Sequence, residues 1–427
     1  MIREFKMINR RSFLKGTLAG AAVAAASPHV IGQAKPRVVV IGGGSGGATA
    51  ARYLAKDSKG ELDVVLIEPT RTYYTCFFSN LYIGGFRDFQ SIGHTYGKLA
   101  SDFGVTVVHD WATGIDMNYK TVSLASGTKM TYDRLVVAPG IDFKYDTVPG
   151  YTAASSGKMP HAWKGGSQTQ LLRAQVENMR QGGTFMMVAP PNPYRCPPGP
   201  YERVSMVAHV LKQSNPTAKI IVLDPKEKFS KQGLFQDGWN RYYDGMVEWI
   251  PASFYGGIKN IDADNMTIDV EGETFKPDVA NIIPGQQAGT IAVAAGLTND
   301  KGFCPIVPAT MQSQVDDNVY VLGDATIAGD MPKSGFSANS QAKVAAMAIR
   351  GDLTGSRVFK PKFSNTCWSL IATDDGVKVG ASYEATDEKI AKTTGFISQV
   401  GEEADLRKQT YEESIGWYNG IVSDMFG

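Results

Sequence analysis

The residues of this chain best suited to redox chemistry are its four cysteines, Cys76, Cys196, Cys304 and Cys367. Two thiols can form a disulfide, and a nucleophile can open that disulfide so that its electrons are left on sulfur. No two of the four are two or three positions apart, which excludes the ligand patterns of zinc and iron–sulfur sites. The sequence C-x-x-C-H is also absent, so we expect no metal site and no c-type haem on this chain.

A glycine-rich turn near the beginning of the chain predicts a dinucleotide site. Gly42, Gly44 and Gly47 follow an apolar, β-branched run at 37–41 and precede a predicted helix. Such glycines let the backbone approach a pyrophosphate at a helix N-terminus, where free N–H groups favour an anion. The next β-branched run ends in Glu68, the position from which a carboxylate accepts hydrogen bonds from a ribose. Strand, turn, helix, strand and acid together favour a bound dinucleotide over a ligand-free turn.

The first 34 residues predict an export signal of the twin-arginine type. Arg10 and Arg11 precede a weakly apolar run at 16–26, and small residues stand at 32 and 34. A membrane anchor is the alternative, but the run is shorter than the roughly 20 residues that span a bilayer. We therefore expect a mature chain that is exported to the periplasm, is not inserted in the membrane, and meets an oxidising environment.

The overall charge says little in favour of nucleic acid as a partner. There are 43 Lys and Arg against 42 Asp and Glu, a formal net charge of +1. Nucleic-acid binding requires a basic face, so we expect no such partner.

The middle of the chain predicts a second dinucleotide fold that lacks its binding turn. Strands are expected at 184–189 and 219–223, the second ending at Asp224. The turn between the first of these strands and its helix, residues 190–200, contains six prolines in eleven residues. Proline has no backbone N–H and a fixed φ, so this turn cannot surround a pyrophosphate.

These patterns predict an α/β fold with two Rossmann-like dinucleotide-binding domains and a C-terminal α+β interface domain. The first dinucleotide-binding domain is interrupted by the second, which is NAD-like, and alternating and aromatic runs followed by a polar helix form the last part. The expected parts are the export signal 1–34, the first half of the first dinucleotide-binding domain 35–150, the middle domain 151–275, the second half of the first dinucleotide-binding domain 276–355, and the interface domain 356–427.

Three segments resemble the FAD fingerprints of the two-dinucleotide-domain flavoprotein disulfide reductases. They are the glycine turn with Glu68, the segment 132–140, and the segment 318–325. The resemblance implies that the interrupted domain, residues 35–150 and 276–355, is an FAD domain, and that Asp324 binds the ribityl chain of the flavin.

More narrowly, the chain resembles the flavoprotein subunit of flavocytochrome c sulfide dehydrogenase. The resemblance rests on the twin-arginine leader, the segments 74–80 and 196–203, and Cys367. It implies a sulfide dehydrogenase whose FAD is bound covalently through a thioether at Cys76. It also implies that sulfide reacts at a disulfide beside the flavin, and that electrons leave to a separate c-type cytochrome subunit that alone carries haem.

The sequence leaves alternatives open for the roles of the cysteines. Cys76 could equally be an unmodified small core residue. If it is tethered, three pairings of the other cysteines are open. The resemblance favours a redox pair of Cys196 and Cys367, with a purely structural crosslink as the alternative. Cys304 is then expected to be a buried bystander.

Charged residues near these cysteines complete the candidate site. Glu202 is either the base or proton shuttle of the reaction, or a solvated carboxylate that complements a helix start. Lys333, just before a predicted helix start at 335, is expected to stabilise the reduced anionic flavin. Arg195 could lower the pKa of a neighbouring thiol, or could be a surface charge.

Three other functions remain as alternatives. A sulfide:quinone oxidoreductase resembles this chain in fold and chemistry, but it requires a membrane-facing amphipathic segment, and the predicted final helix at 402–425 is polar. A non-catalytic flavin-binding subunit would differ in not being bleached by sulfide. An NADH dehydrogenase is disfavoured by the missing second glycine motif.

Overall fold

The computed structural model describes residues 34–427. The predicted export signal therefore lies, except for its last residue, outside the described residues. Residues 36–427 form one compact unit. Among residues 34–427, no helix combines the length and the apolar composition needed to cross a bilayer.

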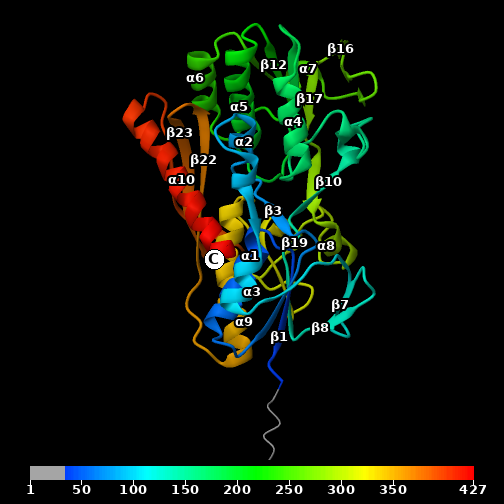
Figure 1. Cartoon of the computed structure of the whole chain (residues 1–427), viewed down its shortest axis with the longest axis vertical. Coiled ribbons are helices and arrows are strands. Elements are labelled where there is room, and N and C mark those ends of the chain that lie inside the picture. The colour runs from blue at the N-terminus through cyan, green and yellow to red at the C-terminus, as the bar shows by residue number, and fades with distance from the viewer. Residues whose placement is uncertain (1–33) are drawn as a thin grey trace, which may run out of the picture. The chain divides into compact units, whose positions relative to one another are not determined.

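The first sheet contains five parallel strands in the order β20-β9-β1-β2-β5 (Figure 1). The strands are β1 Arg37–Ile41, β2 Asp63–Ile67, β5 Thr106–Val108, β9 Arg134–Val137 and β20 Val319–Val321. The runs predicted at 37–41 and 63–67 form β1 and β2, which pair in parallel from Arg37 with Asp63 to Ile41 with Ile67. Both are buried along almost their whole length, which is why they are apolar without alternation.

The parallel register brings the predicted FAD residues to one edge of this sheet. β1 has β2 on one side and β9 on the other, and β20 continues beyond β9. The carboxyl ends of parallel strands share an edge, where α/β proteins bind their ligands. The glycine turn follows β1, Glu68 follows β2, and Asp324 follows β20.

The second sheet contains four parallel strands in the order β13-β12-β11-β17. The strands are β11 Thr184–Val188, β12 Lys219–Asp224, β13 Val247–Pro251 and β17 Val279–Ile282, and the helices are α4 Ser167–Glu177, α5 Gly199–Ser214 and α6 Gln232–Tyr242. The strands expected at 184–189 and 219–223 are confirmed as β11 and β12. β17 pairs with β11, so this sheet extends past residue 275, where the sequence placed the end of the middle domain. A four-residue apolar strand does not reveal which sheet it joins, and the division into domains stays a prediction.

The C-terminal part contains a three-stranded antiparallel sheet and a long helix. The elements are β22 Lys362–Ala372, β23 Asp375–Ala385, β24 Ile390–Ile397 and α10 Ala404–Phe426. Figure 1 shows α10 running alongside this sheet. It packs against β23 and β22, and against the helices α1 Ser45–Asp57, α3 Gly97–Phe103 and α9 Gly335–Thr354. The mixed strands and final helix expected from the sequence are confirmed.

The remaining elements are short connections, additional hairpins and helices. They are α1 Ser45–Asp57, β3 Thr72–Tyr74, α2 Ser79–Ile83, η1 Phe89–Ile92, β4 Gly93–Thr95, α3 Gly97–Phe103, β6 Ala112–Asp116, β7 Thr121–Leu124, β8 Lys129–Thr131, β10 Ile141–Lys144, η2 Tyr145–Thr147, η3 Ser155–Gly157, α7 Ala252–Tyr255, β14 Asn260–Asp262, β15 Thr267–Val270, β16 Glu273–Phe275, β18 Gly285–Ala288, α8 Thr290–Ala294, β19 Cys304–Pro305, η4 Gly323–Ala325, β21 Thr326–Ile327 and α9 Gly335–Thr354.

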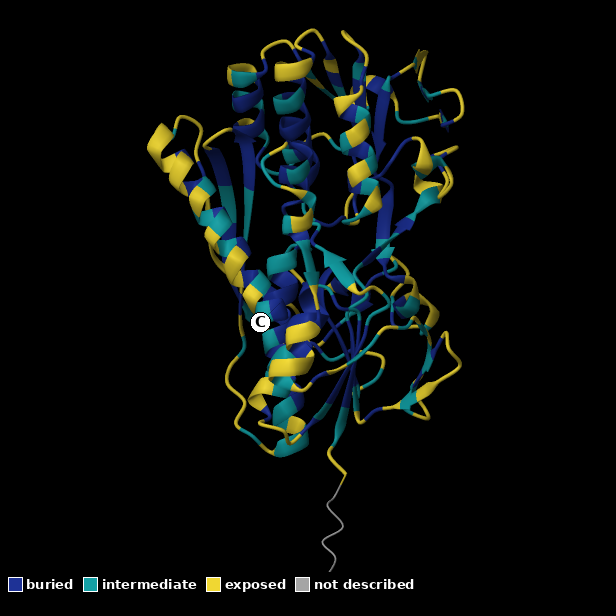
Figure 2. Ribbon diagram, viewed as in Figure 1, coloured by how far each residue is buried: buried dark blue, intermediate teal, exposed yellow. Residues whose placement is uncertain are grey.

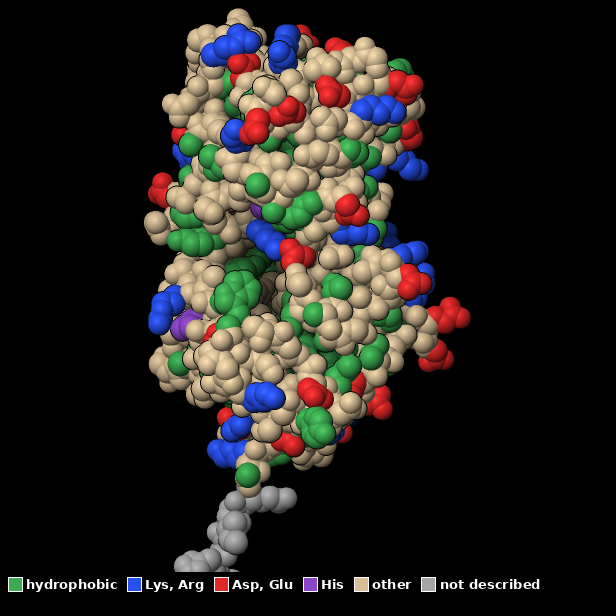
Figure 3. All heavy atoms as spheres, turned by 90° about the vertical axis from the view of Figure 1, so that its right-hand side faces the viewer, with side chains coloured by type: hydrophobic (Ala, Val, Ile, Leu, Met, Phe, Trp, Pro, Cys, Tyr) green, Lys and Arg blue, Asp and Glu red, His purple; other side chains and the backbone are tan. Residues whose placement is uncertain are grey.

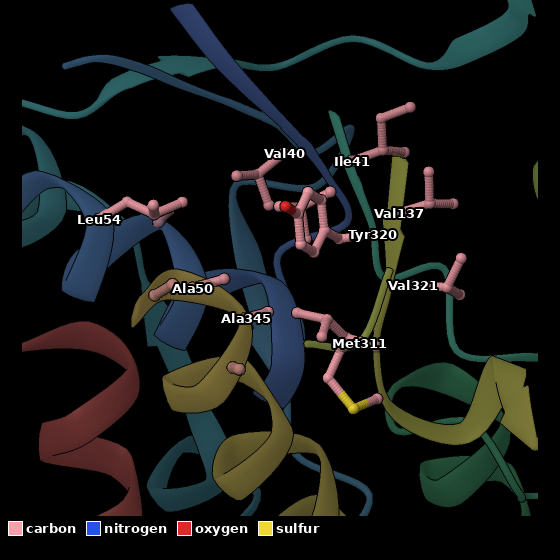
Figure 4. Close-up of a cluster of buried hydrophobic side chains, with 14 of the residues drawn as sticks. Val40, Ile41, Ala50, Leu54, Val137, Met311, Tyr320, Val321 and Ala345 are labelled. Atoms are coloured by element: carbon pink, nitrogen blue, oxygen red, sulfur yellow. The ribbon is translucent and has the colours of Figure 1, made fainter. Parts of the chain in front are cut away.

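Burial follows the sheets. Figure 2 shows buried residues along the strands and exposed residues on loops and on the outer faces of helices. On the face seen in Figure 3, acidic and basic side chains are interspersed, and no large basic patch gathers there. Figure 4 shows the core beneath the first sheet, where Leu54 of α1, Tyr320 of β20 and Ala345 of α9 meet Val40 of β1. Apolar packing thus holds the helices α1 and α9 against the first sheet.

Candidate functional site

The glycine turn after β1 has a geometry that only glycine permits. Gly42 has φ +96°, and a Cβ on Gly47 would lie 1.8 Å from the carbonyl oxygen of Gly42. Helix α1 begins at Ser45, and its N-cap residue, Gly44, makes no side-chain cap. The first N–H groups of a 13-residue helix therefore face the turn without a capping side chain, as a pyrophosphate site requires.

The carboxylate of Glu68 lies against this turn. Its Oε2 accepts a hydrogen bond from the Gly43 amide at 2.8 Å, and its Oε1 accepts from the Thr70 amide at 2.9 Å and from its hydroxyl at 2.6 Å. Glu68 is partly buried at the end of β2. The turn and the acid are therefore adjacent, as the sequence pattern predicted.

Asp324 supplies a buried carboxylate from the other side of the first sheet. It is 9% exposed, and its Oδ1 has no hydrogen-bond partner among the described residues. Its Oδ2 lies 3.7 Å from Nη1 of Arg195, and burial raises the pKa of the carboxyl. A buried polar oxygen without a partner is costly, so Asp324 is suited to accept from a ligand's hydroxyl groups. Together with the glycine turn and Glu68, this unpartnered oxygen fits FAD.

Three of the four cysteines line one pocket together with Glu202. Cys76 comes from the segment after β3, Cys196 from the turn before α5, and Cys367 from β22. The pocket encloses about 890 Å³ of space, part of it open to solvent. All four cysteines of the described chain are free thiols, and Cys304 is fully buried outside this pocket in β19. The fold thus brings together the three cysteines to which the resemblance assigned a role.

Cys196 lies in a strained turn. Its φ is +58°, a left-handed conformation that is uncommon for residues other than glycine. The turn is fixed by hydrogen bonds from the Cys196 amide to the Lys333 carbonyl at 2.8 Å and from the Gly199 amide to the Cys196 carbonyl at 2.8 Å. Burial raises the pKa of the Cys196 thiol well above its usual range, and negative charge on Cys367 and Glu202 raises it further.

The surroundings of Cys367 stabilise negative charge better than those of Cys196 do. The Nδ2 of Asn365 lies 3.4 Å from the Cys367 sulfur as a donor. Burial raises the pKa of this thiol too, but the Asn365 amide and the ammonium of Lys231 oppose that increase. The two cysteines thus differ in how well their surroundings stabilise a thiolate.

Glu202 joins three elements at the pocket. Its Oε2 accepts from Asn80 Nδ2 of α2 at 2.8 Å, and its Oε1 accepts from the Leu370 amide of β22 at 2.9 Å. Burial raises the pKa of this carboxyl. Glu202 lies in the first turn of α5, as the alternative of a helix-start carboxylate requires, but its side chain is bound by protein donors inside the pocket rather than solvated.

Lys333 lies just before α9, beside the segment that carries Asp324, and its role towards the flavin stays a prediction. Its ammonium donates to the carbonyl oxygens of Asp324 at 3.0 Å and Thr326 at 2.5 Å, and it lies 3.8 Å from the ring centre of Phe303. Lys333 is not among the residues that line the cysteine pocket, whereas Gly335 at the start of α9 is. A flexible lysine side chain takes the nearest carbonyl acceptors, here those of the segment after β20, and this choice cannot be read from its position before a helix.

Arg195 is a buried residue and not a surface charge. It is 9% exposed, its guanidinium contacts the Trp163 carbonyl, and its amide donates to Gln286 Oε1 at 2.9 Å. Its nearest carboxylate is that of Asp324. Arg195, which directly precedes Cys196, therefore connects this turn to Asp324, the residue predicted to bind FAD.

Sequence reasoning gave no role to two buried cations of this site, Arg203 and Lys231. Arg203 is 1% exposed and donates to Asn80 Oδ1 at 3.1 Å, to Asn281 Oδ1 at 3.1 Å and to the Ala162 carbonyl at 2.6 Å. Burial lowers the pKa of Arg203 to about 9. Lys231 lies behind Cys367, in a polar segment that also contains Lys226 and Lys228, and nothing in the sequence distinguishes it from them.

Three tryptophans are the other residues that the sequence did not indicate. Trp163, Trp368 and Trp417 all line the pocket, and none of their indole N–H groups has a partner among the described residues. The rings of Trp368 and Trp417 are 5.1 Å apart. The pocket is therefore largely aromatic, with unused donors, as expected for a site that encloses a planar polar ring.

Family models match four parts of the chain. A model for the central part of the sulfide dehydrogenase [flavocytochrome c] flavoprotein chain matches residues 169–284, and a model for flavocytochrome c sulphide dehydrogenase, flavin-binding, matches residues 359–426. A pyridine nucleotide-disulphide oxidoreductase model matches residues 36–176, and a twin-arginine translocation signal model matches residues 7–27.

Individual relatives agree with these matches. The chain is 52% identical over 44 residues to a sulfide dehydrogenase [flavocytochrome c] flavoprotein chain of Chlorobaculum thiosulfatiphilum, covering 10% of this chain and 90% of that sequence. It is 24% identical over 417 residues to a sulfide-quinone reductase of Aquifex aeolicus, covering 91% of this chain and 93% of that one. The X-ray structure of the sulfide:quinone oxidoreductase from the same organism superimposes with a TM-score of 0.69 at 20% identity, covering 91% of this chain and 92% of that chain, and supports the predicted fold.

Proposed function

The chain belongs to the flavocytochrome c sulfide dehydrogenase flavoprotein family, and on that premise we propose that it oxidises sulfide at a disulfide formed by Cys196 and Cys367. Membership makes it a sulfide-oxidising flavoprotein that binds FAD, and its twin-arginine signal directs it to the periplasm. The proposal adds the identity of the disulfide, the tether at Cys76, and a c-type cytochrome subunit as the electron acceptor.

The observation that carries the proposal is the meeting of Cys76, Cys196, Cys367 and Glu202 in one pocket. These residues come from the segment after β3, from the turn before α5 and α5 itself, and from β22, so local structure alone does not explain their proximity. A purely structural crosslink between two sheets has no need of a third cysteine and a buried carboxyl around it. Perturbed titratable groups gathered in a cleft are typical of a reactive site.

The proposed first step is the opening of the disulfide by hydrosulfide. In the oxidised protein Cys196 and Cys367 share an S–S bond. HS⁻ forms a new S–S bond with one sulfur, and the old S–S bond breaks with its electron pair on the other sulfur. The products are one persulfide and one thiolate, so the single negative charge of HS⁻ is conserved.

Glu202 is the proposed proton acceptor after that step. The persulfide carries the one proton that came with HS⁻, and Glu202 would accept this proton when the persulfide ionises. Burial raises the pKa of Glu202, which makes its carboxylate a better base than an exposed one. Its two hydrogen bonds, from Asn80 and Leu370, hold the carboxyl at the pocket in either protonation state.

FAD, when bound, accepts an electron pair and passes electrons on one at a time. In this chain, the glycine turn, Glu68 and Asp324 would hold it, and a thioether at Cys76 would prevent its loss after export. Passing electrons to a separate c-type cytochrome fits a chain whose sequence has no haem attachment motif of its own.

The test is the addition of sulfide to the isolated mature chain in the absence of oxygen. We expect stoichiometric bleaching of the flavin absorbance, followed by recovery when a c-type cytochrome is added. Absence of bleaching in flavin-loaded, folded protein would overturn the proposed reaction and favour a non-catalytic flavin-binding subunit.

The covalent tether is tested separately by acid precipitation. Flavin should stay with the wild-type polypeptide, and Cys76→Ala should release it to the supernatant, because the thioether requires this sulfur. Cys304→Ala is the matched control, since Cys304 is a cysteine outside the pocket. Release of flavin from the wild-type protein would contradict the tether without affecting the disulfide chemistry.

A quinone acceptor is the second candidate, because the relative that is similar along 91% of this chain is a sulfide-quinone reductase. Parallel assays with a water-soluble quinone and with cytochrome c distinguish the two. We expect cytochrome c to be the better acceptor of electrons from sulfide.

A further inference from the structure

Lys231 is a buried lysine placed directly behind the strand that carries Cys367. It is 5% exposed and precedes α6 as its N-cap residue. Its ammonium donates to the Cys367 carbonyl at 2.9 Å, to Ser369 Oγ at 2.9 Å and to the Val377 carbonyl at 3.4 Å. The ammonium is thus held by β22 and β23, at the strand position of the reactive cysteine.

The acceptors of Lys231 are neutral, which distinguishes it from the neighbouring buried lysine. Lys226 forms an ion pair with Asp224 at 2.6 Å, and that carboxylate is fully buried. Within residues 34–427, no carboxylate lies within ion-pair distance of Lys231. A buried charge without a counter-charge is unfavourable, and a protein retains one where a negative charge appears beside it.

The groups that face Lys231 indicate where that charge would be. Burial lowers the pKa of Lys231, negative charge on Cys367, then Glu202, then Cys196 opposes that decrease, and the resulting pKa is about 8. Cys367 comes first because side chains two apart on a strand share a face, and Lys231 contacts Ser369, two residues further along β22. Arg203, the other buried cation here, is already engaged by Asn80, Asn281 and two backbone carbonyls.

We propose that Lys231 is the counter-cation of the anionic sulfur that forms on Cys367 when sulfide opens the Cys196–Cys367 disulfide. This inference rests on the proposed function. If HS⁻ attacks Cys196, the S–S bond breaks with its electron pair on Cys367, which leaves as a thiolate. If HS⁻ attacks Cys367, that residue becomes a persulfide, which is anionic once its proton has passed to Glu202. In both routes the negative charge on the Cys367 side faces the ammonium of Lys231.

Lys231 is a positioning residue in this scheme, because it contacts the strand and not the reacting sulfur. A purely structural role, bracing α6 against β22 and β23, would predict lower stability on substitution but an unchanged Cys367 thiol. The test must therefore report on the sulfur itself.

The experiment measures the rate at which iodoacetamide alkylates Cys367 in the flavin-loaded, reduced protein as a function of pH. The Cys196→Ser background leaves Cys367 as the reactive thiol of the pair, and peptide mass mapping separates it from Cys76 and Cys304. Only the thiolate reacts, so the midpoint of the profile reports the pKa of this thiol. Lys231→Met removes the charge, Lys231→Gln removes it but keeps a hydrogen-bond donor, and Lys231→Arg keeps it.

We expect Lys231→Met and Lys231→Gln to slow alkylation at about pH 7.5 by about tenfold, the change that one pKa unit produces. Lys231→Arg should retain most of the rate. The matched control is Lys226→Met, which removes a buried lysine that faces Asp224 and should leave the Cys367 profile unchanged. Should Lys231→Met fail to fold, Lys231→Gln and Lys231→Arg still give the comparison. Identical profiles for wild-type Lys231 and Lys231→Gln, or an equal shift in Lys226→Met, would overturn the inference.

Failure of this inference is distinguishable from failure of the proposed function. Alkylation requires no sulfide, whereas bleaching of the wild-type flavin by sulfide requires no substitution at residue 231. If substitution of Lys231 alters the alkylation profile of Cys367 but sulfide does not bleach the wild-type flavin, Lys231 is supported as a counter-cation and sulfide is contradicted as the substrate. If sulfide bleaches the flavin but the profile is unaltered, sulfide is supported as the substrate and the role of Lys231 is contradicted.

Discussion

The two parallel sheets of this protein share a strand order but differ in the turn at which a nucleotide would bind. β5-β2-β1-β9 in the first sheet corresponds to β13-β12-β11-β17 in the second. Residues 42–44 connect β1 to α1, whereas residues 189–198 connect β11 to α5. The short turn is glycine and leaves helix N–H groups free, while the long one is rich in proline and carries Cys196 into the pocket.

The acids at the ends of β2 and β12, Glu68 and Asp224, also differ. Glu68 is partly exposed and accepts a hydrogen bond from the glycine turn. Asp224 is fully buried and accepts from Tyr201 Oη at 2.6 Å and Trp249 Nε1 at 3.0 Å, besides its ion pair with Lys226. The comparison teaches that the same strand order can carry a turn suited to a nucleotide in one sheet and, in the other, a proline-rich turn that holds a cysteine at a pocket.

The largest expected effect comes from substituting either cysteine of the proposed disulfide. Cys196→Ser and Cys367→Ser should each keep bound flavin but lose sulfide-dependent reduction of cytochrome c by several orders of magnitude, because a hydroxyl can neither be opened by hydrosulfide nor pass on electrons. Steady-state assays on folded, flavin-loaded protein measure this. Dithionite should still bleach the flavin of both variants, and Cys304→Ser should retain turnover.

A structural crosslink predicts a different result for the same variants. Loss of a brace lowers the free energy of unfolding by about 2–5 kcal/mol while turnover per folded molecule stays nearly intact. Near-normal sulfide turnover in either serine variant would therefore assign the pair a structural role.

The second prediction concerns the nucleotide that the second turn would bind. NADH at micromolar concentration should not bleach the flavin, since six of the eleven residues 190–200 are prolines. The amides of Arg195, Cys196 and Gly199 are already bound to protein acceptors. Stopped-flow absorbance measures the reaction, with sulfide as the positive control. Rapid stoichiometric bleaching by NADH would contradict this interpretation of the turn.

The third prediction compares the contributions of Asp224 and Glu68 to stability and to flavin retention. Asp224→Asn should lower the free energy of unfolding by about 3 kcal/mol, because it leaves the buried Lys226 without its counter-charge. Flavin content should not change in this variant. Glu68→Gln should do the opposite and weaken flavin retention in a Cys76→Ala background with little loss of stability. Urea denaturation and flavin release measure the two effects, and equal effects of both substitutions would remove the distinction between the sheets.

The smallest expected effect is a pH dependence of stability. Burial raises the pKa of Glu202, so above the unfolded value of about 4.3 the folded protein holds a proton that the unfolded chain has released. The free energy of unfolding should then fall as pH rises through this window, by at most about 1.4 kcal/mol per pH unit. Glu202→Gln lacks this contribution and should show a flatter dependence in urea denaturation between the two pKa values. Parallel curves for wild type and Glu202→Gln would contradict the raised pKa.

The sequence by itself determined the parts whose structure is local. A β-branched run, a glycine turn and a terminal acid predict β1, the start of α1 and the position of Glu68, because backbone conformation and hydrophobic burial there depend on neighbouring residues. The residue types of the proline-rich turn likewise predict, by themselves, that no second pyrophosphate site forms there. The family resemblance then indicated which cysteines to compare.

Only the tertiary structure decided how side chains from distant elements meet. β22 places Cys367 beside the turn of Cys196, and the Glu202 carboxyl is enclosed by donors from α2 and β22. Lys333 donates to backbone carbonyls after β20. Lys231 differs from its neighbouring lysines because it donates to the Cys367 carbonyl of β22. The physical reason is that the burial and partners of a long charged side chain depend on which remote backbone packs against it, and no local pattern encodes that choice.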